Sequence, residues 1–224
     1  MNSATHFTWD FGVFFRDLPF LLKGLVVTIE VSLLSMVAGT VLGLVVALMR
    51  LAPARPLRWV AAFYVDFLRA TPLLIQLVWV FFALPILLGY SLPPVPAAVL
   101  TLGAYSGAYL AEIFRSGILS VAVGQRHAAL ALGMTGAQAL RRIILPQAIV
   151  RMLPPIAGTF ITLVKDSSLV SLISVSELMW AAQSLSAISL RPAEILTGTG
   201  LIYVAVTYPL SLVAELVRRR LLTV

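Results

Sequence analysis

The sequence lacks cysteine and has only two histidines and two lysines among its 224 residues. Without cysteine there is no disulfide, no thiolate nucleophile and no thiolate metal ligand. His6 and His127 lie too far apart to form a common metal-binding motif. Neither Lys23 nor Lys165 follows a glycine, as the lysine of a phosphate-binding P-loop does. We therefore expect no metal site, no bound cofactor and no P-loop nucleotide site in this chain.

Charged residues are also scarce, at 11% of the chain, whereas 60% of the residues are hydrophobic. A soluble domain is typically about 25% charged and about 45–50% apolar. The charge-free runs 31–49, 70–111 and 195–214 approach or exceed the ~20 residues that a helix needs to cross a bilayer. They do not alternate apolar and polar residues as the strands of a membrane β-barrel do. The expected fold class is therefore an all-α integral membrane protein.

Arginines, prolines and glycines divide this chain into five expected transmembrane helices. The breaks are "RLAPARPLR" at 50–58, "GYSLPPVP" at 89–96 and "RRR" at 218–220. The expected spans lie at 18–49, 57–88, 94–117, 152–176 and 194–217. Residues 18–224 should form one transmembrane domain. Residues 1–17 should form an interfacial segment rather than a cleaved signal, because "FTWDFGVFF" (7–15) is rich in aromatics and follows no basic region.

The distribution of charge predicts how these spans are oriented. Segments 50–58, 115–151 and 218–220 together contain eleven basic residues and no acid. The other connecting segments, 1–23, 89–94 and 176–194, contain three basic residues and four acids. Because basic loops stay in the cytoplasm, the N-terminus should lie outside and the C-terminus inside. The formal charge of +7 then reflects the topology of the chain. We expect the basic residues to contact anionic lipid of the inner leaflet rather than nucleic acid.

Residues 118–150 form the long connection on the expected cytoplasmic side. "QRHAALAL" and "GAQALRRIIL" are rich in strong helix formers and are joined at Gly133–Gly136. The sequence therefore predicts two short helices, whose leucines and isoleucines are too apolar for a solvated linker. Two interpretations remain open. The helices lie against the inner leaflet or under the span ends, or one of them docks its apolar face into a groove of a partner protein.

The spacing of small residues in this connection resembles a known motif. His127-Ala128-Ala129 is followed by three residues, Gly133, nine residues and then "IILP" at 143–146. Membrane subunits of binding-protein-dependent ABC importers carry Glu-Ala-Ala, three residues, Gly, nine residues and Ile-x-Leu-Pro. Every spacing agrees, and His127 replaces the family's glutamate. The following stretches resemble the polar amino-acid branch of that family: "RATPLLIQL" (69–77), "AYLAEIFRSGILSV" (108–121), "LPQA" (145–148) and "LVKDSSLVSLI" (163–173).

This resemblance implies a type I ABC importer-like fold in the bacterial inner membrane, in which the connection forms the coupling helices. It also implies three kinds of partner: two ATP-binding subunits, a second permease subunit that forms a homo- or heterodimer with this chain, and a periplasmic substrate-binding protein. ATP would bind only to the ATP-binding subunits. The residues expected to couple to the ATPase are Gly124, Gln125, Arg126, His127, Ala128, Ala129, Gly133, Ile143, Leu145 and Pro146. Small side chains in this set would let a helix backbone lie close to its partner.

Ionisable residues at bilayer depth are costly and are functional candidates for that reason. If the fourth span begins at Pro154–Pro155, Lys165 lies about 15 Å along it, near the middle of the bilayer. Asp166 should point about 100° away from Lys165, so that each meets a partner on another helix. The expected path or gate residues are Arg69, Thr71, Pro72, Glu112, Lys165, Asp166, Ser167 and Ser168.

Structural roles for the same residues remain open. Lys165 and Asp166 could serve only as an ion pair that fixes helix packing, and Glu112 could only pair with Arg115 one turn later. Glu30 matches no motif of the family.

A stand-alone secondary transporter or channel is the alternative function. It would need internal repeats or broken helices around a midplane site, and it leaves the basic connection unexplained. An intramembrane enzyme would need a nucleophile–base or metal pair, for which the sequence offers no candidate. Which amino acid or related solute is carried cannot be deduced from the sequence.

Overall fold

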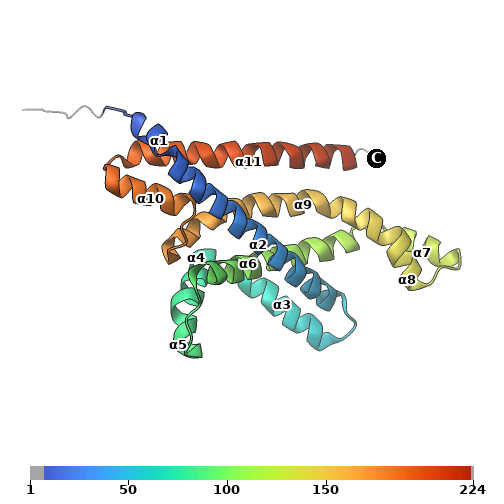
Figure 1. Cartoon of the computed structure of the whole chain (residues 1–224). Helices are drawn as coiled ribbons and strands as arrows, with labels where there is room; N and C mark the ends of the chain where they lie inside the picture. Colours follow the sequence, from blue (N-terminus) through green and yellow to red (C-terminus); the bar gives the residue numbers. More distant parts are fainter. Residues whose placement is uncertain (1–7, 223–224) are drawn as a thin grey trace, which may run out of the picture.

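The structure, a computed structural model, describes residues 8–222, with side chains described as far as Arg219. His6 and the first residues of the expected interfacial segment therefore lie outside the described residues. Every element of regular secondary structure in the described range is a helix, which confirms the expected all-α class (Figure 1). Four helical stretches are long and apolar enough to cross a membrane, namely Leu18–Leu51, Pro94–Leu119, Gly136–Ile173 and Pro192–Arg219.

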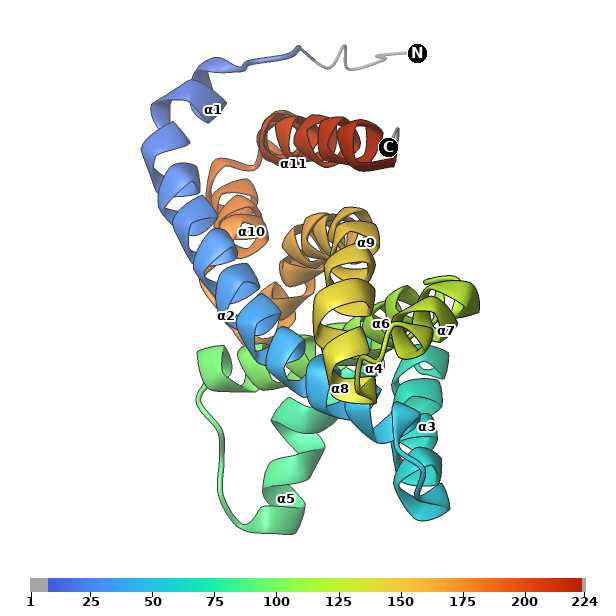
Figure 2. The same ribbon diagram turned by 90° about the vertical axis from the view of Figure 1, so that its right-hand side faces the viewer.

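These stretches form the body of the protein. They comprise α2 (Leu18–Leu51), α6 (Pro94–Leu119), the run from α8 (Gly136–Ala139) through η2 (Leu140–Ile144) and α9 (Leu145–Asp166) to η3 (Ser167–Ile173), and α11 (Pro192–Leu222). In Figure 1, α6, α9 and α11 run roughly parallel and α2 crosses them obliquely. Figure 2 views the bundle from the end at which α8 lies, with α9 and α11 seen nearly end-on.

The second expected span is not one straight helix. Residues 57–88 fall on α3 (Arg55–Ala70) and on a second arm made of α4 (Leu73–Val78), η1 (Trp79–Ala83) and α5 (Leu84–Leu88). The chain bends by 105° between the two arms. The expected count of five spans is reached only if this bent pair counts as one.

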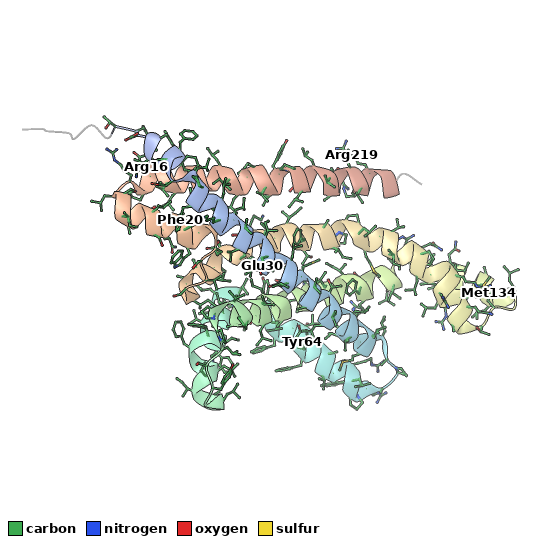
Figure 3. The ribbon with its side chains drawn as sticks, in the orientation of Figure 1. Arg16, Phe20, Glu30, Tyr64, Met134 and Arg219 are labelled. Atoms are coloured by element: carbon green, nitrogen blue, oxygen red, sulfur yellow. The ribbon has the colours of Figure 1, made fainter. Side chains whose placement is uncertain are left out.

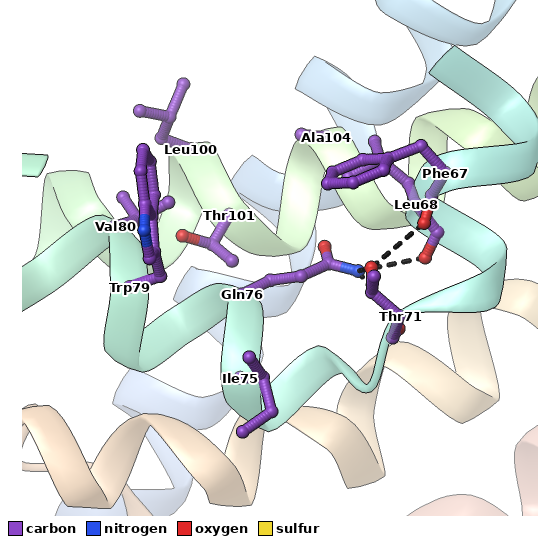
Figure 4. A pocket seen from close by; sticks show the side chains of 10 residues that line it. All are labelled: Phe67, Leu68, Thr71, Ile75, Gln76, Trp79, Val80, Leu100, Thr101 and Ala104. Carbon is purple, nitrogen blue, oxygen red and sulfur yellow. Dashed lines mark hydrogen bonds between the residues drawn. The ribbon is translucent and has the colours of Figure 1, made fainter. Parts of the chain in front are cut away.

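The corner between the two arms has a local cause. The ring of Pro72 disfavours helical geometry at Thr71, which is extended (φ −101°, ψ 140°). The amide of Gln76 then donates hydrogen bonds to the carbonyl oxygens of Leu68 (2.8 Å) and Thr71 (3.1 Å) (Figure 4). These bonds satisfy carbonyls that the end of α3 leaves without helical partners.

The fourth long helix starts earlier than expected. Pro154 and Pro155 lie inside α9 rather than at its start. Prolines are tolerated inside membrane helices where other groups satisfy the freed carbonyls. Lys165 consequently lies at the C-terminal end of α9, where the helix tightens into the 3₁₀ segment η3, and not at the middle of a span that begins at Pro154.

Both π-helical segments of the described chain precede a proline. η1 ends one residue before Leu84-Pro85, and η2 ends one residue before Leu145-Pro146. Proline cannot donate the helical hydrogen bond, and its ring clashes with the carbonyl four residues earlier. A turn that holds one extra residue relieves that clash, because its bonds run from residue i to i+5.

The most extensive helix contact joins α2 to α6 through glycines on both helices. Gly39 and Gly43 of α2 face Gly103 and Gly107 of α6. A Cβ placed on Gly43 would lie 2.9 Å from the carbonyl oxygen of Gly107. Each helix therefore presents a Gly-x-x-x-Gly face, the pattern that lets membrane helices approach backbone to backbone.

The expected external loop 176–194 contains a further helix, α10 (Leu178–Ser189). Left-handed residues bound it, with Ser174 at φ 64° before it and Leu190 at φ 54° after it. α10 packs against α2 and α11, and the short helix α1 (Gly12–Arg16) contacts α11 nearby (Figure 1). The segment is therefore an ordered helical layer over one end of the bundle.

Candidate functional site

A cavity of about 380 Å³ lies between α6 and α9. Its polar lining consists of Tyr105, Ser106, Tyr109, Thr159, Thr162 and Asp166. The half-buried carboxylate of Asp166 is the charged group in this wall. A cavity between two apolar helices that presents hydroxyls and one carboxylate can hold a small polar cation.

Arg69 extends toward this cavity from α3. Its guanidinium lies over the ring of Tyr109, 5.2 Å from the ring centre, a cation–π geometry. The hydroxyl of Tyr105 donates to that of Tyr109 over 3.2 Å. The structure thus brings Arg69 and Asp166 to one region, with the two tyrosines between them.

The other path candidates on the fourth helix point elsewhere. Lys165 is exposed and, unlike Asp166, does not line the α6–α9 cavity, so the two side chains face apart as expected. Within residues 8–222, neither forms an ion pair or hydrogen bond. The hydroxyl of Ser167 is buried and donates to the Val164 carbonyl oxygen at 2.8 Å. Ser168 is half-buried on η3.

Thr71 and Pro72 form the corner between α3 and α4. Thr71 belongs to a separate apolar cavity of about 350 Å³ between that corner and α6. Phe67, Trp79 and Leu100 are among its walls, and the Gln76 side chain crosses it toward Thr71 (Figure 4). The corner is therefore not part of the polar α6–α9 cavity.

Glu112 forms a small ionic cluster at the C-terminal ends of two helices. It accepts hydrogen bonds from Arg115 one turn later on α6, as the sequence predicted. It also accepts from Arg50 at the end of α2, over 2.9 Å, a contact that the sequence did not indicate. Arg50 and Arg115 line a further cavity of about 500 Å³, with Arg58 and Asp66 of α3. The cluster fixes the end of α2 to α6.

The connection 118–150 projects beyond the end of α6 (Figure 1). It contains α7 (Val123–Ala131), followed by α8 and η2, as the sequence predicted. Gly133 has φ 78°, a left-handed conformation that ends α7 at low cost only for glycine. Thr135 and Gln138 form a capping box that begins α8. Met134 lies at the far end of this connection (Figure 3).

Burial divides the expected coupling residues into two groups. Ala129 is buried, whereas residues 124–128 and Gly133 are exposed. Ile143 and Leu145 are half-buried and Pro146 is exposed. Ala129 therefore anchors α7 within the chain, and the exposed members form an outward face.

Sequence reasoning missed the most highly connected acid of the chain. Glu177 precedes α10 and is fully buried. Its carboxylate accepts from the backbone N–H groups of Met179 (2.9 Å) and Trp180 (2.7 Å), as an N-cap does. It also accepts from the hydroxyls of Thr28 on α2 (3.2 Å) and Tyr203 on α11 (3.1 Å). One carboxylate thus joins three helices.

The structure also shows the surroundings of two further acids, Glu194 and Glu30. Glu194, counted among the loop acids like Glu177, is also buried, and it accepts from the Asp10 backbone N–H (3.1 Å) and from Arg191. Glu30 is exposed on α2 and forms no ion pair within the described chain (Figure 3). The sequence did offer one signal for Glu177: in "SELMW" (176–180) an acid directly precedes an apolar segment, as an N-cap precedes a helix.

Replacing Glu177 with leucine should lower the stability of the protein by about 2–4 kcal/mol. The change removes an N-cap, worth about 0.5–2 kcal/mol, and leaves the half-buried Tyr203 hydroxyl without its acceptor, at about 1–3 kcal/mol, whereas Thr28 can still donate to the Gly24 carbonyl oxygen. Thermal unfolding in detergent measures the loss. Glu177→Gln keeps one acceptor oxygen and should lose less. Equal melting temperatures for wild type and Glu177→Leu would contradict this role.

Residues 39–223 match the family described as binding-protein-dependent transport system inner membrane component. The arginine transport system permease protein ArtQ of Bacillus subtilis is 37% identical over 212 residues, covering 95% of this chain and 97% of ArtQ. The L-cystine permease protein TcyB of Bacillus subtilis is 42% identical, covering 91% and 87%. The glutamine permease protein GlnP of Escherichia coli K12 is 35% identical, covering 95% and 98%.

Two solved structures share the fold. The crystal structure of an amino acid ABC transporter with histidines superposes with a TM-score of 0.91 at 36% identity, covering 96% of this chain and 100% of that one. The inward-facing MetNI methionine ABC transporter superposes with a TM-score of 0.77 at 22% identity, covering 92% and 98%. The second likeness concerns the fold alone.

Proposed function

The chain belongs to the family of inner membrane components of binding-protein-dependent transport systems, and on this premise we propose how its surfaces serve an amino-acid importer. It is a multi-pass permease subunit of an ATP-driven ABC importer, and such subunits are not themselves enzymes. Its partners include an ATPase and a substrate-binding protein. The observation that carries the proposal is the family match over 39–223, which spans both the α6–α9 cavity and the projecting connection.

The first part of the proposal assigns the projecting connection to the ATPase. Its exposed residues from Gly124 to Ala128, together with Gly133, would seat in a cleft of that subunit, and Pro146 would fix the turn that leads into α9. ATP would bind only to the partner. His127 stands where the family has glutamate, so the partner surface opposite it should accept a neutral or cationic group.

The second part assigns the α6–α9 cavity to the translocation path. An amino acid carries an ammonium and a carboxylate. Asp166 would accept the ammonium, and Arg69, held over Tyr109, would attract the carboxylate. The relatives are named for arginine, cystine and glutamine, which share these two groups. We therefore assign a polar amino acid as substrate, with the cavity as its site in this subunit.

The third part concerns assembly and orientation. We propose that two permease subunits, identical or not, enclose the path, that two ATPases bind below them, and that a periplasmic binding protein delivers substrate from above. The basic segments would face the cytoplasm and the N-terminus the periplasm. Closure of the ATPases would then move the two connections and rock the bundles between outward and inward access.

Single-cysteine labelling tests the orientation and the coupling together, because the chain has no native cysteine to remove. Leu132, 79% exposed in the projecting connection, and Ile188, 81% exposed on α10, suit this purpose. In cells, a membrane-impermeant maleimide should label Ile188→Cys but not Leu132→Cys. In inside-out vesicles the pattern should reverse, and bound ATPase should protect Leu132→Cys.

Ile188→Cys is the matched control, since its labelling should not respond to the ATPase. Labelling of Leu132→Cys from the outside would refute the orientation. Full labelling from the inside, unchanged by an ATPase that restores uptake, would refute the coupling surface.

A further inference from the structure

A further cavity, of about 790 Å³, lies away from the proposed path. It separates the last turns of α2 from the projecting connection. Its walls include Leu44, Leu48 and Leu51 of α2, Ile118 at the end of α6, and Leu140 of η2. These side chains are apolar, so water would occupy the space at a cost proportional to the apolar area.

The apolar wall continues along α2. Val37, Val41, Leu44 and Leu48 follow one another at helical spacing, and Val41 and Leu48 are 63% and 56% exposed. The stripe therefore leads from the middle of a bilayer-length helix directly into the cavity. A hydrocarbon chain can enter along it without leaving apolar surroundings.

Charge at the far wall narrows the choice of occupant. Arg126 on α7 is the charged residue that lines the cavity. Its side chain is exposed, and within residues 8–222 no carboxylate pairs with it. An occupant that combines a long apolar chain with an anionic head complements both walls, and no acidic residue of the lining opposes it.

We propose that this cavity binds an anionic phospholipid of the cytoplasmic leaflet, with an acyl chain along the α2 leucines and its phosphate at Arg126. The lipid fills the gap between the coupling segment and the end of α2. It therefore braces α7 against the membrane helix through Arg126, while the other exposed residues of α7, His127 and Ala128 among them, remain free to contact the ATPase. The inference rests on the proposed cytoplasmic position of this segment.

Lipid retention by the purified permease–ATPase complex provides the test. Native mass spectrometry would compare phosphatidylglycerol with phosphatidylcholine of identical acyl chains, each added to the detergent-solubilised complex. Wild type should retain the anionic lipid preferentially. Arg126→Gln should reduce that preference about fivefold, since one basic residue near an anionic lipid is worth about 1 kcal/mol. Leu48→Trp should reduce retention of both lipids by filling the apolar wall.

Arg55→Gln is the matched control, because Arg55 is also a basic residue at the same end of the bundle but does not line the cavity. It should leave the preference at the wild-type value. Equal retention of the two lipids by wild type would overturn the proposal, as would an unchanged preference in Arg126→Gln. Lipid retention that disappears whenever the ATPase is bound would show that the ATPase fills the cavity. Failure of the ATPase to co-purify would instead count against the coupling surface.

Discussion

Replacing Gly39 with leucine should prevent folded protein from accumulating. A Cβ at this position would collide with the Ser106 hydroxyl and lie 3.0 Å from the Gly103 carbonyl oxygen and 3.1 Å from the Gly107 nitrogen. Two of these three atoms belong to the backbone of α6, so no rotamer change relieves the contact. Overpacking typically costs about 1–3 kcal/mol and occasionally more, and a leucine pressed against backbone atoms should reach the upper end, a large share of the ~5–15 kcal/mol that stabilises a typical domain.

The yield of monodisperse protein after size-exclusion chromatography in detergent measures this effect. Gly200→Leu is the matched control, because Gly200 lies in another long helix and a Cβ there meets nothing within 4 Å. It should be recovered like wild type. Normal recovery of Gly39→Leu would show that α2 does not pack on α6 through these glycines.

Replacing Asp166 with asparagine should lower the efficiency of uptake about 10- to 100-fold with the folded protein retained. The carboxylate lines the α6–α9 cavity without an ion pair in the described chain, so its loss removes one charge-assisted hydrogen bond to the substrate ammonium, worth about 1.5–3 kcal/mol. Initial rates of labelled amino-acid uptake into proteoliposomes, with ATPase and binding protein present, give this value.

Lys165→Gln provides the comparison within the same motif, and it should lose less activity because Lys165 is exposed outside that cavity. Glu215→Gln, which removes a partly exposed acid paired with Arg218 and Arg219 outside the cavity, should stay near wild type. If Asp166→Asn transports as fast as Glu215→Gln, the cavity is not the path.

The sequence predicted those parts of the fold that depend on local composition. α2, α6 and α11 each contain a long charge-free stretch, because a helix that crosses the hydrocarbon core needs about 20 predominantly apolar residues. The corner at Thr71–Pro72 carried a local signal too, but it lies at the start of the charge-free run 70–111, inside the expected span 57–88, which concealed it. Pro154 and Pro155, in contrast, gave a misleading signal: they suggested that a helix starts there, whereas α9 continues through them.

The contacts of the candidate site could not be predicted in the same way. Glu177 was counted as a loop charge because its hydroxyl donors, Thr28 and Tyr203, lie 149 and 26 residues away. Only the folded chain brings them together. Arg69 and Tyr109, likewise, belong to different helices. Where both residues lie on one helix, their spacing was enough to predict the contact: Glu112 pairs with Arg115. It was also enough to predict that Lys165 and Asp166 point in different directions.

The π segment η2 sets the angular phase between the projecting helices and α9. Each residue turns an α-helix by about 100°. Because η2 holds one additional residue, the side chains before Leu140 are rotated about the helix axis, relative to those after Ile144, from the directions that a continuous α-helix would give them. Deleting one residue here, together with exchange of Pro146 for alanine, would allow an ordinary α-helical turn. The exposed face of α7 would then swing around the axis of α9 by roughly that angle, and its surface would no longer be presented in the same direction as in the native chain.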